Sequence, residues 1–209
     1  MADREVTDRE AADDDVLSAD DRSTLLRLAV AAIQSGLERE PIAGLQPPAS
    51  PALRELGASF VTLEDDGRLL GCIGTLRAVR PLYEDVMQNA YRSAFADPRL
   101  PPVSAHEFEV MDVKISVLTA PVPFEVAGRD ELHRVLRPGV DGLLLTDGKR
   151  RSTFLPSVWE KVRGPRHFVD LLLAKGGWRG ARWPPGMQTL LYRTVEFADP
   201  GPRPAPDSA

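Results

Sequence analysis

The sequence predicts an α+β protein with a central, largely antiparallel β-sheet and flanking helices. Alternating apolar residues are joined by turn residues in SFVTLEDDGRLLGCIGTL (residues 59–76), a hairpin pattern. Between such strands lie helical patterns that begin at serine or proline and end near proline or glycine. Strands and helices do not alternate regularly, which argues against a doubly wound parallel sheet.

The first half of the chain begins with a capped helix. Ser18 can cap it, with Asp21 in the capping-box position, and Pro41 ends it. The hairpin of residues 59–76 follows a proline-rich connection. Pro81 then suits the first turn of a second helix, which stops before Pro98 because residues that precede proline disfavour the α region.

The second half is predicted from shorter patterns. VMDVKISVL (residues 110–118) alternates as a half-buried strand, and RDELHRVL (residues 129–136) is typical of a short helix. The remaining predictions are strands at 140–146 and 152–155, helices at 156–162 and 165–177, and one final strand at 187–197.

Composition sets the broad class of the protein. Of 209 residues, 43% are hydrophobic, which fits one folded domain over residues 17–198. Residues 1–16 are acidic and residues 199–209 are proline-rich, so both tails are expected to be disordered. One cysteine, no apolar leader and no apolar run of about 20 residues favour a cytoplasmic protein that does not enter membranes. Abundant Arg, Ala and Pro suggest a bacterial genome rich in GC.

Charge is divided along the chain. The net charge is −5, but residues 1–21 alone carry nine acids against two arginines, and residues 149–182 carry nine basic residues against two acids. Basic residues interleave with tryptophan and phenylalanine between residues 159 and 183. An anionic partner, including nucleic acid, is therefore compatible with the sequence, although no known nucleic-acid motif matches.

Cys72 is the first candidate for chemistry. It lies between Gly71 and Gly74 inside a predicted strand, where glycine is unfavourable, so another element or a ligand is expected to approach the backbone closely. Free cysteine is most often a small buried hydrophobic residue. As a nucleophile it would need a nearby cation or helix N-terminus to stabilise the thiolate.

Two further segments carry candidate residues. Asn89 and Asp97 fall near one face of a helix, and Asp97 and Arg99 flank a proline, so they can brace each other or contact a ligand. The alternative is that Asp97 only caps a turn. Lys149, Arg150 and Arg151 form a basic turn ahead of Thr153 and a helix start, which suits an anion or a solvated loop.

Common cofactor and metal motifs are absent. The sequence has no dinucleotide-binding glycine pattern, no P-loop, no hydrolase nucleophile elbow and no HExxH. We therefore expect no cofactor and no metal site.

Several segments together resemble the AMMECR family, whose prokaryotic members are called AmmeMemoRadiSam system protein A. They are GCIGTL, NAYRSAFADPRLPP, VMDVKISVLT, GVDGLLL, RRSTFLPSVWE and LLLAKGGW, in that order, within residues 20–198. The resemblance implies an α+β fold with a smaller second lobe and a cleft between the lobes. It also implies that these positions match the family motifs: Gly71, Cys72, Gly74, Asn89, Asp97, Arg99, Glu107, Thr153 and Pro156.

The resemblance implies pathway partners as well. Family members often accompany a Memo-type protein and a radical-SAM protein, so a modification pathway is expected. Leu70 stands where the family often has arginine, which removes one cation that would favour a thiolate at Cys72. Two hypotheses follow: an enzyme or enzyme subunit with a cleft centred on Cys72, or a non-catalytic binding or adaptor module in which Cys72 is structural.

Overall fold

The computed structural model describes residues 17–40, 46–178 and 183–203. The chain divides into two compact units: residues 1–117 together with 195–209, and residues 118–194. Residues 1–16 and 204–209, for which disorder is predicted, lie outside the described residues. Within the described ranges, no helix combines the length and apolar character that crossing a membrane requires.

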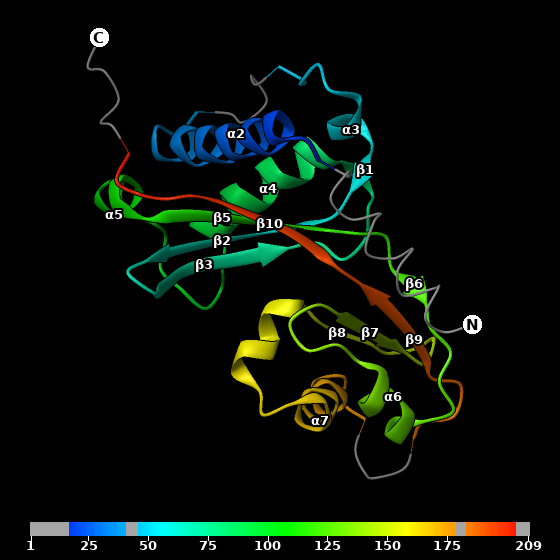
Figure 1. Ribbon diagram of the computed structural model, residues 1–209. Coiled ribbons are helices and arrows are strands. Elements are labelled where there is room, and N and C mark those ends of the chain that lie inside the picture. The colour runs from blue at the N-terminus through cyan, green and yellow to red at the C-terminus, as the bar shows by residue number, and fades with distance from the viewer. Residues whose placement is uncertain (1–16, 41–45, 179–182, 204–209) are drawn as a thin grey trace. The chain divides into compact units, whose positions relative to one another are not determined.

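The first unit is a four-stranded sheet covered by two long helices. The strand order is β10-β5-β2-β3, with β2 (Ser59–Asp65), β3 (Arg68–Gly74), β5 (Asp112–Leu118) and β10 (Thr194–Asp199). Helix α4 (Leu82–Phe95) packs on β2 and β3, and α2 (Ala19–Leu37) packs on α4 (Figure 1). The short elements are α3 (Pro51–Arg54), β1 (Leu56–Gly57) paired with β4 (Arg80–Pro81), and α5 (Ala105–Val110).

Local sequence signals account for these elements. Ser18 and Asp21 form the predicted capping box at the start of α2. In the β2–β3 hairpin, Asp66 and Gly67 both have positive φ, 46° and 78°, the backbone that a tight hairpin turn needs. On β5, Val113, Ile115 and Val117 are buried while the residues between them are only half-buried, as alternation predicts.

The second unit is another antiparallel sheet packed on two helices. The strand order is β6-β9-β7-β8, with β6 (Val122–Pro123), β7 (Gly142–Thr146), β8 (Arg151–Phe154) and β9 (Gln188–Tyr192). Helices α6 (Arg129–Val135) and α7 (Pro165–Lys175) pack on this sheet. The core between them includes Leu143 and Leu145 of β7 and Phe168 of α7. The observed architecture confirms the α+β class, with an antiparallel sheet in each unit.

Three sequence predictions differ from the structure. The single strand predicted at 187–197 is two strands separated at Arg193, and β9 and β10 belong to different sheets. The helix predicted at 156–162 is present and begins at Pro156, but it is a 3-10 helix, η2 (Pro156–Lys161). Residues 199–203 are predicted to belong to a disordered tail, but they are held against α5. The Arg203 amide donates to Glu109 O at 2.8 Å, and the Arg203 guanidinium donates to Phe108 O at 3.0 Å.

Candidate functional site

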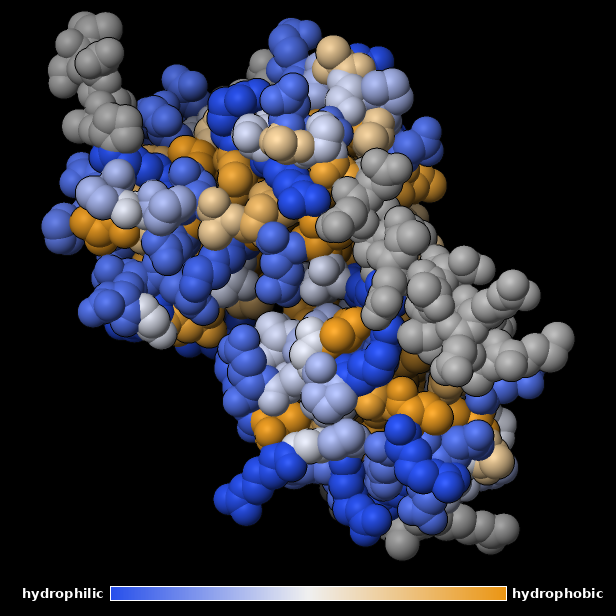
Figure 2. Space-filling view, viewed as in Figure 1, coloured by the Kyte–Doolittle hydropathy of each residue, from blue (hydrophilic) through white to orange (hydrophobic). Residues whose placement is uncertain are grey.

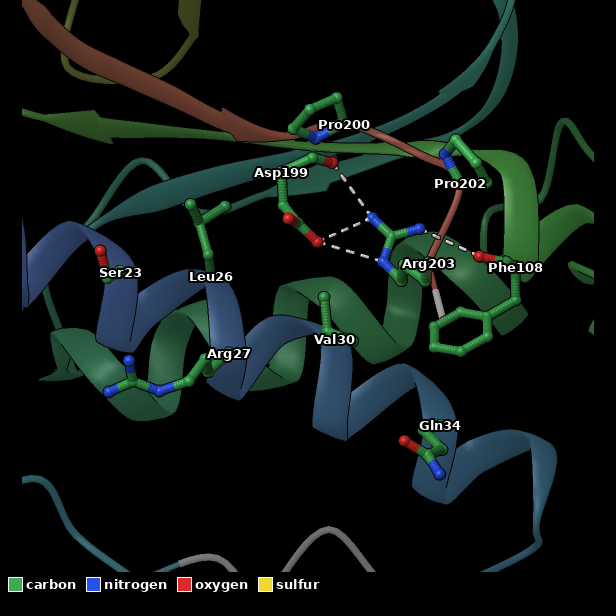
Figure 3. A pocket seen from close by; sticks show the side chains of 10 residues that line it. All are labelled: Ser23, Leu26, Arg27, Val30, Gln34, Phe108, Asp199, Pro200, Pro202 and Arg203. Atoms are coloured by element: carbon green, nitrogen blue, oxygen red, sulfur yellow. Dashed lines mark hydrogen bonds and ion pairs between the residues drawn. The ribbon is translucent and has the colours of Figure 1, made fainter. Parts of the chain in front are cut away.

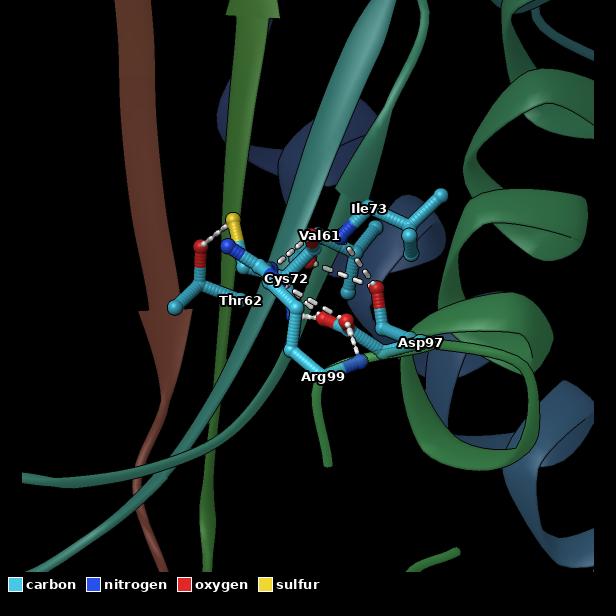
Figure 4. A network of polar contacts seen from close by, with 7 residues as sticks. Val61, Thr62, Cys72, Ile73, Asp97 and Arg99 are labelled. Atoms are coloured by element: carbon cyan, nitrogen blue, oxygen red, sulfur yellow. Dashed lines mark hydrogen bonds and ion pairs between the residues drawn. The ribbon is translucent and has the colours of Figure 1, made fainter. Parts of the chain in front are cut away.

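Cys72 lies on β3, the edge strand of the first sheet, and is partly exposed. It pairs with Thr62 on β2, and the Thr62 hydroxyl donates to the Cys72 sulfur at 3.2 Å. The neighbouring pair, Val61 with Ile73, has Val61 fully buried in the core beneath α4. Because side chains alternate along a strand, the thiol lies on the face of the sheet opposite α4 (Figure 4).

Asp97 and Arg99 hold the backbone of Cys72. The Cys72 amide donates to Asp97 Oδ2 at 3.0 Å, and Arg99 Nη2 donates to the Cys72 carbonyl at 2.9 Å (Figure 4). Arg99 also forms a bidentate ion pair with Asp97: Nε donates to Oδ1 at 2.8 Å and Nη2 donates to Oδ2 at 2.6 Å. An edge strand normally presents unpaired amides and carbonyls to solvent. Here the segment after α4 satisfies both groups of Cys72.

The ion pair fixes the charge state of both partners. The pKa of Asp97 is lowered, chiefly by the hydrogen bond from Arg99 and further by the Cys72 amide, against the effect of burial. Hydrogen bonding to Asp97 likewise raises the pKa of Arg99. The Asp97 side chain is 1% exposed and that of Arg99 60%. Asp97 is thus an ionised carboxylate whose oxygens are engaged, which suits positioning better than proton transfer.

The two glycines beside Cys72 each make room for a neighbour. A Cβ on Gly71 would collide with the backbone carbonyl oxygen of Ser93 on α4, and a Cβ on Gly74 would enter the Phe60 ring. The prediction that another element approaches this strand closely is confirmed. The close approach of α4 also allows Ser93 to bond to the strands: its hydroxyl accepts from Ile73 N–H and donates to Val61 O, both at 2.8 Å.

Asn89 is fully buried and belongs to a polar network under the same sheet. Its amide donates to Ser59 O at 3.0 Å and to Asp85 Oδ2 at 2.9 Å. The Asp85 carboxylate also accepts from the amide and hydroxyl of Ser59 and from the hydroxyl of Thr75, at 2.6–2.9 Å. Sequence reasoning missed Asp85, although its spacing of four residues from Asn89 on the buried side of a helix was a usable signal. A ligand-binding role for Asn89 stays a prediction.

Glu107 lies at a different point of the first unit. It completes a capping box with Ser104 at the start of α5 and pairs with Arg68 Nη2 at 2.9 Å. Arg68 begins β3, four positions before Cys72. Glu107 therefore ties α5 to the start of β3. Its binding role stays a prediction.

Arg151 and Thr153 lie in the second unit, on β8. Arg151 is exposed, whereas Thr153 is buried and its hydroxyl donates to Leu143 O at 2.8 Å and lies 2.7 Å from the Tyr192 hydroxyl. Burial raises the pKa of Tyr192 to about 12. A site that joins these residues to Cys72 stays a prediction.

The described residues contain no group of three or more His, Cys, Asp or Glu side chains arranged to hold a metal ion. The chemical groups around β3 are a partly exposed thiol, a neighbouring hydroxyl, and an ion pair between the buried Asp97 and the exposed Arg99 that holds the strand.

Comparison with known proteins identifies the family. The AMMECR1 family matches residues 26–197, most of the chain. The chain belongs to the AMMECR1 family. A Thermofilum pendens protein is 31% identical over 205 residues, which covers 90% of this chain and 93% of that one. A Methanothermobacter thermautotrophicus protein is 39% identical over 142 residues, covering 68% and 74%.

A solved structure agrees with the fold. The crystal structure of an uncharacterised Pyrococcus horikoshii protein superposes with a TM-score of 0.77 and 28% identity, covering 88% of this chain and 94% of that chain. The α+β architecture of the AMMECR1 family is thus shared. These relatives are archaeal, so they lend no support to the bacterial origin suggested by composition.

Proposed function

We propose that this AMMECR1-family protein is an enzyme, or a subunit of one, in a modification pathway, and that its substrate meets the thiol of Cys72. One observation carries the proposal. Asp97 and Arg99 fix the amide and carbonyl of Cys72, while the thiol remains partly exposed on the sheet face opposite α4. Reacting groups that are held rigidly lose less entropy in reaching the productive geometry.

The family resemblance supports the pathway, with Memo-type and radical-SAM proteins as partners. The charge of the second unit supports an anionic substrate, because residues 118–194 hold 13 basic and 7 acidic residues. The exposed basic residues include Lys149, Arg151 and Arg163. Trp159 and Trp178 are buried, so their rings are not available for stacking on nucleic-acid bases. An anionic substrate should bind more weakly as salt increases.

A second candidate is a binding or adaptor module in which Cys72 is structural. Two contacts favour it: the Thr62 hydroxyl already donates to the sulfur, and Arg99 is already engaged by Asp97. In this case the same residues brace the strand and the thiol takes part in no reaction.

Alkylation of the native protein separates the two candidates. Iodoacetamide is added to wild-type and Cys72→Ala protein, and modification is followed by mass spectrometry. We expect slow but measurable labelling of the folded wild type, because the thiol is partly exposed. Labelling that occurs only on unfolding would remove the catalytic proposal and leave the binding module.

The catalytic step itself is tested by reconstitution with the Memo-type and radical-SAM proteins of the same organism. Cys72→Ala should lower product formation by at least about a hundredfold, as loss of a nucleophile does. Its melting temperature should stay near that of the wild type. Full activity in a folded Cys72→Ala protein would show that the thiol is structural.

A further inference from the structure

A pocket of about 460 Å³ lies within the first unit (Figure 3), and its lining does not include Cys72, Asp97 or Arg99. It opens between α2, α5 and the segment that follows β10. Figure 2 shows a band of hydrophobic residues between α2 and β10 on this face. The residues that line the pocket are Ser23, Leu26, Arg27, Val30, Gln34, Phe108, Asp199, Pro200, Pro202 and Arg203. Its volume falls in the range of about 300–1,000 Å³ that small-molecule sites occupy.

Arg203 holds in place the wall of the pocket that is formed by residues 199–203. Its guanidinium donates to Phe108 O at 3.0 Å, to Met111 O at 2.5 Å and to Asp199 Oδ2 at 3.1 Å. The same group lies over the Phe108 ring, 5.5 Å from its centroid. The prolines of this wall are therefore held in place before any ligand binds, which lowers the entropic cost of binding.

Charge in the pocket is unevenly distributed. Arg203 and Asp199 form an ion pair at 3.1 Å and neutralise each other. Arg27 is exposed on α2, and its described hydrogen bond goes to the neutral hydroxyl of Thr24 at 2.8 Å. The lining is thus net positive, on a unit whose residues include 24 acids against 13 basic groups. Within the pocket, the negatively charged group of a ligand is therefore favoured at Arg27.

From this geometry we propose that the pocket binds a small amphipathic anion. The apolar body of the ligand packs on Leu26, Val30 and Phe108, and its carboxylate or sulfonate lies at Arg27. Ser23 lies four residues before Arg27 on the same helix face and offers a hydroxyl donor to the same headgroup. The site is independent of the function proposed for Cys72.

The test uses 1-naphthoate as the probe and 1-naphthamide as its uncharged counterpart. Isothermal titration calorimetry measures both affinities, and amide chemical shifts locate the bound probe. We expect saturable naphthoate binding with a Kd below about 1 mM, shifts around Ser23, Val30 and Phe108, and weaker binding of the amide.

Two variants and a matched control decide the outcome. Arg27→Gln should weaken naphthoate binding by about threefold to tenfold and leave naphthamide unchanged, while Val30→Phe should weaken both by filling the pocket. Arg92→Gln, an exposed arginine on α4 outside the pocket, should change neither. The proposal is overturned if naphthoate shows no saturation up to about 5 mM, or if Arg27→Gln and Val30→Phe bind it as the folded wild type does.

Discussion

The first unit, residues 1–117 with 195–209, carries 24 acidic and 13 basic residues, whereas the second, residues 118–194, carries 7 and 13. Their cores differ as well. Among the described residues of the first unit, the buried core has one aromatic side chain, Phe108, and the carboxyl side chains of Asp85 and Asp97 are also buried. In the second unit Trp159 stacks on Phe168 with ring centroids 3.9 Å apart, and Trp178 is also buried.

This contrast separates two ways of fixing a sheet. In the first unit, buried carboxylates accept hydrogen bonds from strand β2 or β3, so polar contacts position the backbone around Cys72. In the second unit, large rings fill the space between sheet and helices. Changes to rings should therefore act on the second unit, and changes to carboxylates or close contacts should act on the first.

The largest expected effect comes from the aromatic core. Phe168→Ala should destabilise the second unit by about 3–5 kcal/mol, because the ring is fully buried between Trp159 and Phe154. Hydrogen exchange should show lost protection in β7 and α7, with protection in α4 retained. Phe168→Leu, which keeps most of the volume, should cost less. Equal loss of protection in both units would mean that the two cores fold as one.

The matching change in the first unit is Asp85→Ala. It should cost about 3 kcal/mol, because the Ser59 amide, the Thr75 hydroxyl and the Asn89 amide all lose a buried acceptor. Chemical denaturation followed by hydrogen exchange measures the loss at β2. Asp85→Asn keeps one oxygen acceptor and should cost less. A near-neutral Asp85→Ala would show that the network does not position the sheet.

Close packing at the strand should have a smaller effect. Gly71→Ala should cost about 1–3 kcal/mol, because the new methyl group meets the rigid Ser93 carbonyl of α4. Gly128→Ala is the matched control in the second unit, since a Cβ there meets no atom within 4 Å. Thermal unfolding of both variants gives the comparison. A Gly71→Ala protein as stable as the control would contradict the close approach.

The two units should lose stability at different pH values as the solution is made more acidic. Burial lowers the pKa of His133, whose side chain is 10% exposed, and the nearby Arg129 adds to the effect. The unfolded chain therefore binds a proton more readily, and the second unit should lose stability as pH falls below about 6.5. The lowered pKa of Asp97 works at lower pH: its contribution is present above about 3.9 and is lost as pH falls further.

Unfolding midpoints measured from pH 7 to pH 4 check this difference. His133→Leu should flatten the decline of the second unit, and Asp97→Asn should leave that decline unchanged. A His133→Leu protein with the pH profile of the wild type would remove His133 as its cause.

Elements whose signals are local could be predicted from the sequence alone. The Ser18 capping box, the Asp66–Gly67 turn and the alternation along β5 are set by neighbours within a few residues, and each is present in the structure. The order of the motifs also indicated the AMMECR family. The family match over residues 26–197 confirms this resemblance.

Strand pairing and the surroundings of the thiol depend on long-range packing, which the sequence pattern does not reveal. The pattern at 187–197 looks like one strand, but a strand's partners depend on packing across the sheet, and the chain passes from one sheet to the other at Arg193. Gly71 and Gly74 predicted a close neighbour without naming α4 or Phe60. The engagement of Asp97 and Arg99 with the Cys72 backbone joins residues 25 and 27 positions apart, and such contacts form only when the helix between them folds onto the sheet.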